Sequence, residues 1–278
     1  MLIALTIVSF GTCAPEIAIS FQSVSKGDGQ MAFANVVGSC IVNVFLVLGL
    51  ACFLRPIKVK HATIKKELPI LVLVTTVFSV LMLDRLFNPL TRNSFSRADG
   101  IILILLFLVF VVYLVQMLFH KPKEEEPQIL FHPLVSLLFL AVSIVVIIFS
   151  SDLIVTSAKN IAYSLNISEK IITMFAVVIG TSLPEMVMTV SSARKGEFDI
   201  AIGNIIGTNI FNICIVLGLP TVIYGDVLLT GFGFVDILAV FLSSFLLFLF
   251  ARSERTLSKK EGIIMLLVFL AYYIYLLV

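Results

Sequence analysis

Two carboxylates stand inside apolar, helix-length stretches of this chain. Glu16 ends the hexapeptide Gly-Thr-Cys-Ala-Pro-Glu at 11–16, and Glu185 ends Gly-Thr-Ser-Leu-Pro-Glu at 180–185. A charged group is costly to keep in apolar surroundings, so it usually marks an ion pathway, a proton relay or a counter-ion. Hard oxygen ligands suit calcium, which takes about six to eight of them, better than zinc or copper. The pattern therefore predicts a cation site with these two carboxylates at its centre.

A proline stands immediately before each glutamate. Pro15 and Pro184 lack a backbone N–H, and each ring displaces the carbonyl oxygen four residues earlier, at Gly11 and Gly180. Freed carbonyls inside a membrane are tolerated only where they are buried in protein or line a cavity. We therefore expect a break in the helix here, with carbonyls and hydroxyls completing the oxygen set. The hydroxyl-bearing candidates are Thr12, Thr181 and Ser182.

A second short motif follows each glutamate motif. Residues 35–43 pair with 204–212, and both have the form Asn-x-x-Gly-(Ser/Thr)-x-x-x-Asn. The hydroxyl and the last asparagine are four residues apart, so they share one face of a helix, and the glycine lets a neighbouring helix approach closely. Such polar side chains also serve as hydrogen-bonding contacts between helices. Their recurrence in both copies favours the cation site and adds Ser39, Asn43, Thr208 and Asn212.

These motifs belong to an internal duplication. Residues 1–50 align with 170–219 without a gap and share 18 identities. A proline-broken, acid-bearing segment that occurs twice is typical of transporters whose cation site lies between two repeats. An enzyme is not predicted, because the apolar segments contain no visible nucleophile–base pair or metal-binding histidine spacing.

The composition is that of a protein that crosses a membrane several times. Hydrophobic residues make up 60% of the 278 residues and charged residues 13%, and the mean hydropathy is +1.14. A soluble domain could not cover so much apolar surface. The net charge of +2 does not suggest nucleic acid, and the four cysteines show neither metal-binding nor disulfide spacing. We expect the lipid bilayer as the main partner, and no cofactor.

Nine apolar segments approach the length of about 20 residues that a membrane-spanning helix needs. They are 1–22, 30–53, 68–88, 101–119, 131–158, 170–192, 198–223, 230–251 and 260–278. Lipid offers the backbone no hydrogen-bond partners, so an all-α bundle is expected. Of the 19 basic residues, 13 lie in the loops 54–67, 120–130, 193–197 and 252–261. This bias places those loops in the cytoplasm and the C-terminus outside.

The same orientation makes the repeats inverted, because segment 1–22 enters the membrane from the cytoplasm and its copy 170–192 from the outside. The expected domains are a first repeat, 1–119, a cytoplasmic linker, 120–130, and a second repeat, 131–278. Each repeat should be a five-helix unit, but the first helix of the first unit is missing, since Met1 aligns with Lys170. We expect a truncated chain or a natural nine-span variant. Truncation is favoured because such transporters use matching halves.

The residues resemble the calcium/cation antiporter superfamily, and most of all its prokaryotic sodium/calcium exchangers. The resemblance rests on the two Gly-Thr-x-x-Pro-Glu motifs and the two asparagine motifs, and it extends over the whole chain apart from the absent first helix. It implies exchange of sodium for calcium across the plasma membrane of a prokaryote. By this resemblance, Glu16 and Glu185 would bridge calcium, and Thr12 and Thr181 would add backbone carbonyls. Sodium-site side chains would be Cys13, Ser182, Ser39 and Thr208.

Two residues depart from the family pattern. Cys13 stands where a serine is common, which puts soft sulfur where sodium favours oxygen. Asn212 stands where many of these exchangers have an aspartate. The site therefore holds two acids rather than three, and its charge stoichiometry is open.

Several alternatives remain open. A calcium/proton exchanger would use the same carboxylates to carry protons, and sodium dependence at fixed pH separates the two. A cation channel is a second class, but proline-broken inverted repeats favour alternating access. A truncated fragment that folds without transporting is the third. Among other acids, Asp152 is either part of an access path or a polar helix end, and Asp236 is expected at the membrane interface.

Overall fold

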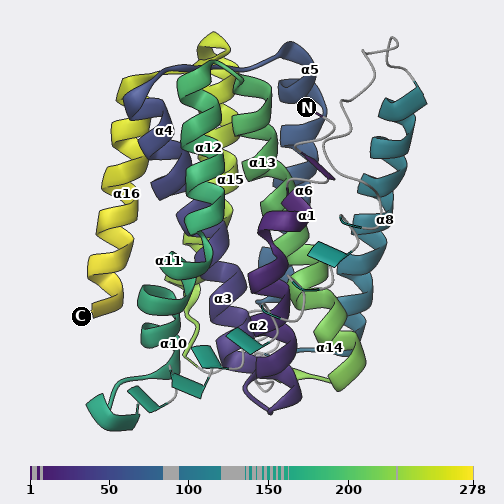
Figure 1. The fold of residues 1–278 in the computed structure, drawn as a ribbon, viewed down its shortest axis with the longest axis vertical. Helices are drawn as coiled ribbons and strands as arrows, with labels where there is room; N and C mark the ends of the chain where they lie inside the picture. Colours follow the sequence, from purple (N-terminus) through teal and green to yellow (C-terminus); the bar gives the residue numbers. More distant parts are fainter. Residues whose placement is uncertain are drawn as a thin grey trace.

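Helices make up nearly all of the structure, a computed structural model that describes residues 1, 5–6, 9–83, 94–119, 163–229 and 231–277 and isolated helical positions between 135 and 161. The predicted linker 120–130, most of the predicted segment 131–158 and Asp152 lie outside the described residues. Figure 1 shows long helices running along one common direction, as expected for an all-α bundle.

The first half of the chain is described up to residue 119. Its elements are α1 (Ser9–Thr12), α2 (Ala14–Ser25), α3 (Gly29–Ile41), the π-helix η2 (Val42–Leu48), α4 (Gly49–Leu54), β1 (Ile57–Lys58), α5 (His61–Lys65), α6 (Glu67–Leu81), β2 (Ser94–Phe95) and α8 (Arg97–Phe119).

The second half has a similar order, except for α10 and η3 at its start and for α5, which is described in the first half alone. Its elements are α10 (Glu169–Ile172), the π-helix η3 (Thr173–Val177), α11 (Val178–Thr181), α12 (Leu183–Lys195), α13 (Phe198–Phe211), the π-helix η4 (Asn212–Leu217), α14 (Gly218–Tyr224), β3 (Val227–Leu228), α15 (Phe234–Glu254), β4 (Thr256–Leu257) and α16 (Lys259–Leu277).

Five helices of the described chain are long and apolar enough to cross a membrane. They are Gly29–Leu54, Arg97–Phe119, Phe198–Tyr224, Phe234–Glu254 and Lys259–Leu277. A sixth candidate is the pair Lys170–Thr181 and Leu183–Lys195, which is bent by 45° at the break between them. The prediction of a multi-pass helical membrane protein is therefore confirmed.

Burial separates the helices into an inner pair and an outer set. In the apolar stretches of Gly29–Leu54 and Phe198–Tyr224, 83% of the residues are buried, whereas the share is only 17% for Arg97–Phe119 and 33% for Lys259–Leu277. The inner spans carry the predicted asparagine motifs, and the outer spans turn leucine, valine and isoleucine side chains outward. An outward apolar surface on long helices is what a lipid-facing element requires.

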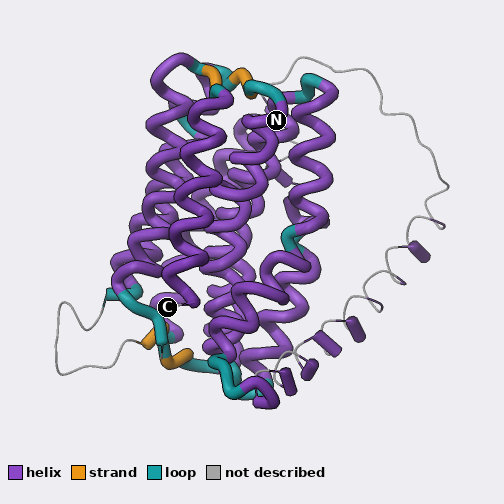
Figure 2. The backbone as a smooth tube through the Cα atoms, turned by 90° about the vertical axis from the view of Figure 1, so that its left-hand side faces the viewer, coloured by secondary structure: helices purple, strands orange, loops and turns teal. Residues whose placement is uncertain are grey.

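Two short strand pairs tie the halves together at opposite ends of the bundle (Figure 2). β1 pairs antiparallel with β4, with Ile57 opposite Leu257, and β2 pairs with β3, with Ser94 opposite Leu228. Each pair joins one strand from the first half to one from the second. The halves therefore form one interlocked bundle rather than two separate units.

Matching contacts recur at matching positions of the two halves. The Asn35 side-chain amide donates to Ser20 Oγ over 3.3 Å, and that of Asn204 donates to Thr189 Oγ1 over 3.2 Å. Both members of the second pair lie 169 residues after those of the first. Recurrence on this offset extends the sequence duplication to three-dimensional contacts.

Close helix packing between the halves also occurs twice, at matching places. A Cβ added to Gly262 of α16 would lie 2.8 Å from the Gly49 carbonyl oxygen of α4, and one added to Gly100 of α8 would lie 2.8 Å from that of Gly218 in α14. Each outer helix thus packs backbone to backbone on the inner helix of the other half. Small residues permit this approach.

The glycines of the asparagine motifs make the predicted close approach. A Cβ on Gly38 would lie 2.6 Å from Met174 Sδ and 2.7 Å from Val178 Cγ2, while one on Gly207 would lie 3.1 Å from Leu5 Cα. The partners again lie 169 residues apart, since Met174 corresponds to Leu5. Each glycine therefore allows close packing of the half-helix that precedes the glutamate of the other repeat.

We expect Gly38→Ala and Gly207→Ala to destabilise the protein, because an added methyl group must push apart a well-packed contact at a cost of about 1–3 kcal/mol. Thermal unfolding in detergent should show a lower Tm for both variants. Gly11→Ala is the control, since a Cβ there meets no atom of the described residues within 4 Å. Equal Tm values for all three variants would refute the close-approach role.

Candidate functional site

Both prolines break their helices where the sequence predicts a break. α1 ends at Thr12 and α2 begins at Ala14, with Pro15 in its first turn; α11 ends at Thr181 and α12 begins at Leu183, with Pro184 in its first turn. Proline is tolerated in a first helical turn because the N–H it lacks has no intrahelical partner there. Each glutamate consequently lies in the first turn of the second helix segment.

The two glutamates are buried in the interior of the bundle. Glu16 and Glu185 are both 0% exposed. Neither carboxylate has a hydrogen-bond partner among the described residues. Buried charges are ordinarily paired or coordinate metal ions, so the two unpartnered carboxylates are candidate cation ligands.

The two halves contribute to one site rather than to two. The Glu16 carboxylate lies beside Thr181 of the second half, and the Glu185 carboxylate lies beside Thr12 of the first. The charges of the two carboxylates interact across this crossed arrangement. Like charges in a low-dielectric interior repel strongly. A divalent cation between the two carboxylates would attract both and offset this repulsion.

Five further predicted residues carry buried polar atoms that are without a partner in the described part of the chain. These atoms are Ser39 Oγ, Asn43 Oδ1, Ser182 Oγ, Thr208 Oγ1 and both amide atoms of Asn212. At least nine in ten buried polar groups in proteins form hydrogen bonds. The unpartnered atoms here are mainly hydroxyl and amide oxygens, which are the kinds of ligand that a hard cation uses.

The remaining three predicted residues direct their side chains to the backbone. Thr12 donates to the Ser9 carbonyl over 3.3 Å, and Thr181 donates to the Val178 carbonyl over 3.2 Å. The Cys13 thiol donates to the Thr208 carbonyl of the other half over 3.8 Å. Each threonine hydroxyl thus donates to the backbone of its own helix, while its side chain lies beside the glutamate of the other half.

Two asparagines contact the candidate site residues in ways that the sequence prediction did not include. Asn35 donates to the Glu16 carbonyl oxygen over 3.3 Å, which fixes the backbone of that glutamate. Asn209 accepts from Asn43 over 3.0 Å and donates to the Cys40 carbonyl over 3.3 Å. Duplication of Asn35 as Asn204 was a usable signal.

No such signal existed for Asn209, because it aligns with Cys40. The π-helices that follow the asparagine motifs were also not predicted. η2 begins at Val42 and η4 at Asn212, so each widened turn includes the last asparagine of its motif. π-Helical turns occur frequently at functional sites because they redirect side chains that a regular helix would place elsewhere.

A hollow of about 480 Å³ lies next to the glutamate motifs. Pro15 and Ile19 of α2 line one side, and Gly180, Thr181 and Pro184 line another. The hollow thus borders both helix breaks.

No group of three or more histidine, cysteine or acidic side chains able to hold a metal occurs in the described residues. A cation here would therefore be held by two carboxylates and neutral oxygens. Such a donor set, with few charges and many neutral oxygens, suits transient binding better than a permanent structural metal.

Comparison with known proteins identifies a family for this chain. The family model described as sodium/calcium exchanger protein matches residues 1–116 and 135–278. Inner membrane protein YrbG of Escherichia coli (strain K12) is 34% identical over 233 residues, which cover 80% of this chain and 69% of YrbG. Sodium/calcium exchanger MaX1 of Methanosarcina acetivorans is 27% identical over 315 residues, which cover 97% of this chain and 87% of MaX1.

A solved structure of the sodium-calcium exchanger NCX_Mj has a TM-score of 0.74 at 27% identity and covers 97% of this chain and 85% of that one. The matches extend over both halves, and they confirm the resemblance carried by the glutamate and asparagine motifs. This chain belongs to the sodium/calcium exchanger family of multi-pass membrane antiporters.

Proposed function

We propose that this protein exchanges sodium for calcium across the membrane by alternating access at a site centred on Glu16 and Glu185. The observation that carries the proposal is the pair of fully buried carboxylates without hydrogen-bond partners among the described residues. Hydroxyl and amide oxygens of Ser39, Asn43, Ser182, Thr208 and Asn212 complete the site in this proposal. Backbone carbonyls of Thr12 and Thr181 add to it, and Cys13 borders it.

The charge of the site explains why exchange would be coupled. Two ionised carboxylates in a low-dielectric interior are costly unless a cation neutralises them. One calcium ion or several sodium ions do so, but they compete for the same oxygens. The empty site resists closure because it is doubly negative, so the protein changes sides only when it is loaded. Sodium that enters down its gradient then expels calcium.

An inverted repeat supplies the two faces that alternating access needs. We propose that 1–119 and 131–278 are related by a two-fold axis in the membrane plane, with 120–130 as the linker and nine spans in all. Support comes from the matching contacts at Asn35 and Asn204 and from the crossed strand pairs at the two ends.

The orientation in the membrane follows from charge. The β1–β4 end of the bundle carries most basic residues of the described chain, including Arg55, Lys58, Arg194 and Arg255, whereas the β2–β3 end carries Lys26, Arg97 and Lys170. Cytoplasmic loops are enriched in lysine and arginine. We propose that the β1–β4 end is cytoplasmic and the C-terminus is outside, in the plasma membrane of a prokaryote.

Calcium-45 uptake into proteoliposomes tests the proposed exchange. Vesicles loaded with sodium should take up calcium when diluted into sodium-free medium, and vesicles without a sodium gradient should not. A matched pH gradient at equal sodium tests proton exchange, the main alternative. Uptake driven by the pH gradient alone would replace sodium with the proton as counter-ion, and absence of uptake under either gradient would overturn the proposal.

Cys13→Ser is expected to lower the sodium concentration for half-maximal exchange, since a hard cation favours oxygen over sulfur. The second half offers a matched control, because Ser182 occupies the position equivalent to Cys13. Ser182→Cys should shift the sodium dependence in the opposite direction. Sodium-activation curves from the same uptake assay measure both. Identical curves for the two variants and the parent would remove Cys13 and Ser182 from the sodium site.

A further inference from the structure

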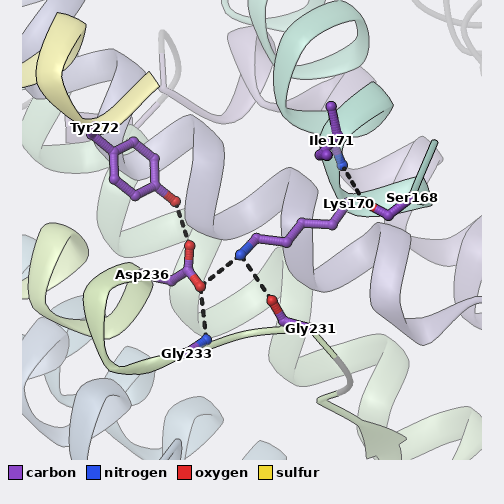
Figure 3. Close-up of polar contacts among 7 residues, drawn as sticks. All are labelled: Ser168, Lys170, Ile171, Gly231, Gly233, Asp236 and Tyr272. Atoms are coloured by element: carbon purple, nitrogen blue, oxygen red, sulfur yellow. Dashed lines mark hydrogen bonds and ion pairs between the residues drawn. The ribbon is translucent and has the colours of Figure 1, made fainter. Parts of the chain in front are cut away.

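A buried ion pair lies outside the proposed cation site. Lys170 Nζ is 2.6 Å from Asp236 Oδ2 and donates to the Gly231 carbonyl over 2.9 Å. The same Asp236 oxygen accepts from the Gly233 N–H over 2.8 Å, and the other oxygen accepts from the Tyr272 hydroxyl over 2.8 Å. Figure 3 shows these side chains converging from three separate segments of the chain.

This network is deeply buried and well satisfied. Asp236 is 0% exposed and Lys170 only 8%, and the lysine ammonium lies 4.8 Å from the centre of the Phe232 ring. A buried ion pair persists only where extra hydrogen bonds offset its desolvation. The sequence predicted an interfacial Asp236 and gave Lys170 no role. The lysine and the aspartate are 66 residues apart, and neither belongs to a repeated motif.

The ion pair holds the outer end of the helix that leads to the site. Lys170 begins the helical stretch through α10, η3 and α11, which ends at Thr181 beside the Glu16 carboxylate. A second tether lies one turn further on, where the Tyr273 hydroxyl donates to the Met174 carbonyl over 2.9 Å. Phe175 adds an edge-to-face contact with the Tyr273 ring. Both tethers fix this half-helix to α16 or to the start of α15.

Another face of the same half-helix borders the hollow beside the glutamate motifs. Ile172, Ala176 and Gly180 line the hollow and are spaced four residues apart, so they form one stripe. Residues between 146 and 161 line the hollow as well. Because the half-helix is tethered on one face and borders the hollow on another, a release of its tethers would let the hollow beside Thr181 change its width.

The first half has only part of this network. Glu67 occupies the position equivalent to Asp236 and accepts a hydrogen bond from Tyr113 of α8, as Asp236 does from Tyr272 of α16. The other Glu67 oxygen has no partner in the described part of the chain. The acid–tyrosine bond recurs in both halves, whereas the lysine bond is described in the second half alone.

We propose that the Lys170–Asp236 ion pair is a positioning element for transport. It holds residues 169–181 against α15 and α16 and thereby sets the access of cations to the site through the hollow. Lys170 does not touch the cation in this arrangement; it acts through the half-helix that it anchors. The inference rests on the proposed cation site at Glu16 and Glu185.

Kinetics of a neutralised pair test the positioning role. The double variant Lys170→Gln/Asp236→Asn removes both charges together, so that no uncompensated charge remains buried, and Lys170→Arg keeps the ion pair as the control. Positioning predicts that the calcium KM of the double variant rises about fivefold or more, the lower range of an energetic coupling between distant sites. The maximal rate should change much less, and Lys170→Arg should behave as the parent does.

Accessibility gives a readout that does not depend on transport. Ala176→Cys places a thiol in the stripe that borders the hollow, and the four native cysteines are at most 1% exposed. A membrane-impermeant methanethiosulfonate reagent should modify this cysteine faster when the ion pair is neutralised, and at the parent rate when Lys170→Arg is present. Tyr273→Phe loosens the second tether without altering charge and should shift the rate in the same direction.

The outcomes separate the two proposals. Parent-like KM and parent-like labelling in both the double variant and Tyr273→Phe would overturn the positioning role, while sodium-driven calcium uptake by the parent would leave the cation site standing. Absence of uptake by the parent would overturn the proposed function, and the labelling rates would still decide whether the tethers hold the half-helix. A changed KM together with faster labelling supports the inference.

Discussion

Glu16→Gln and Glu185→Gln are each expected to lower sodium-driven calcium transport by about a hundredfold or more. Loss of one partner in a buried charge interaction costs about 3–5 kcal/mol, and each 1.36 kcal/mol corresponds to a factor of ten. Glutamine keeps the shape of the side chain and one oxygen atom, but it removes the negative charge that attracts calcium. Initial rates of calcium-45 uptake in proteoliposomes measure the loss.

The same two variants should be at least as stable as the parent when no cation is present. Each removes one of two buried, mutually repelling carboxylates, so the apo protein loses an unfavourable interaction. Glu67→Gln is the matched control, because Glu67 is also a buried carboxylate but bonds to Tyr113 away from the site. Near-normal transport by either site variant would refute the two-carboxylate mechanism. Transport loss that merely follows a lower Tm would also refute it.

Asn212→Leu and Asn209→Leu are expected to change stability in opposite directions. Neither amide atom of Asn212 has a partner in the described part of the chain, and an apolar replacement removes an unsatisfied buried group worth about 1–3 kcal/mol. Asn209 instead bridges Asn43 and the Cys40 carbonyl. Its replacement leaves both partners without this hydrogen bond and should lower the free energy of unfolding by a similar amount.

Transport should not follow stability in this pair. Asn212→Leu is expected to be as stable as the parent or more so, yet to lose about tenfold or more of its transport, because an oxygen ligand is missing from the cation site. Asn209→Leu should lose stability and transport together, because it removes the hydrogen bond that holds Asn43. Thermal unfolding and uptake rates on the same preparations decide the matter. A destabilised Asn212→Leu would show that this asparagine is a packing contact.

The sequence was sufficient to locate the helix breaks, and the structure buries both of the glutamates that the sequence singled out. Pro15 and Pro184 break the helices by removing a donor, and this effect depends on local geometry alone. The duplication pointed to the other candidate residues. A polar side chain is costly in apolar surroundings, so its occurrence at the same place in both repeats is easily distinguished from a chance occurrence. Family membership followed from the same motifs, and the comparison with known proteins confirmed it.

Features that occur once were not predictable in this way. Asn209 has a cysteine at its counterpart position, and Lys170 has a methionine, so the duplication says nothing about either. Their partners are fixed by tertiary packing, across 166 residues for Asn209 and 66 for Lys170. The π-helical turns η2 and η4 occur in both halves but were also not predicted, since neither stretch carries a local signal that distinguishes π from α.

Equilibrium binding of calcium-45 to the purified protein, with sodium titrated in, tests the central claim most directly. The proposed site predicts that a single calcium ion binds per chain, that sodium displaces it completely, and that Glu16→Gln and Glu185→Gln bind none. Calcium that stays bound at saturating sodium would show that the two ions do not share these oxygens. Calcium that binds normally to either glutamine variant would place the cation site elsewhere in the protein.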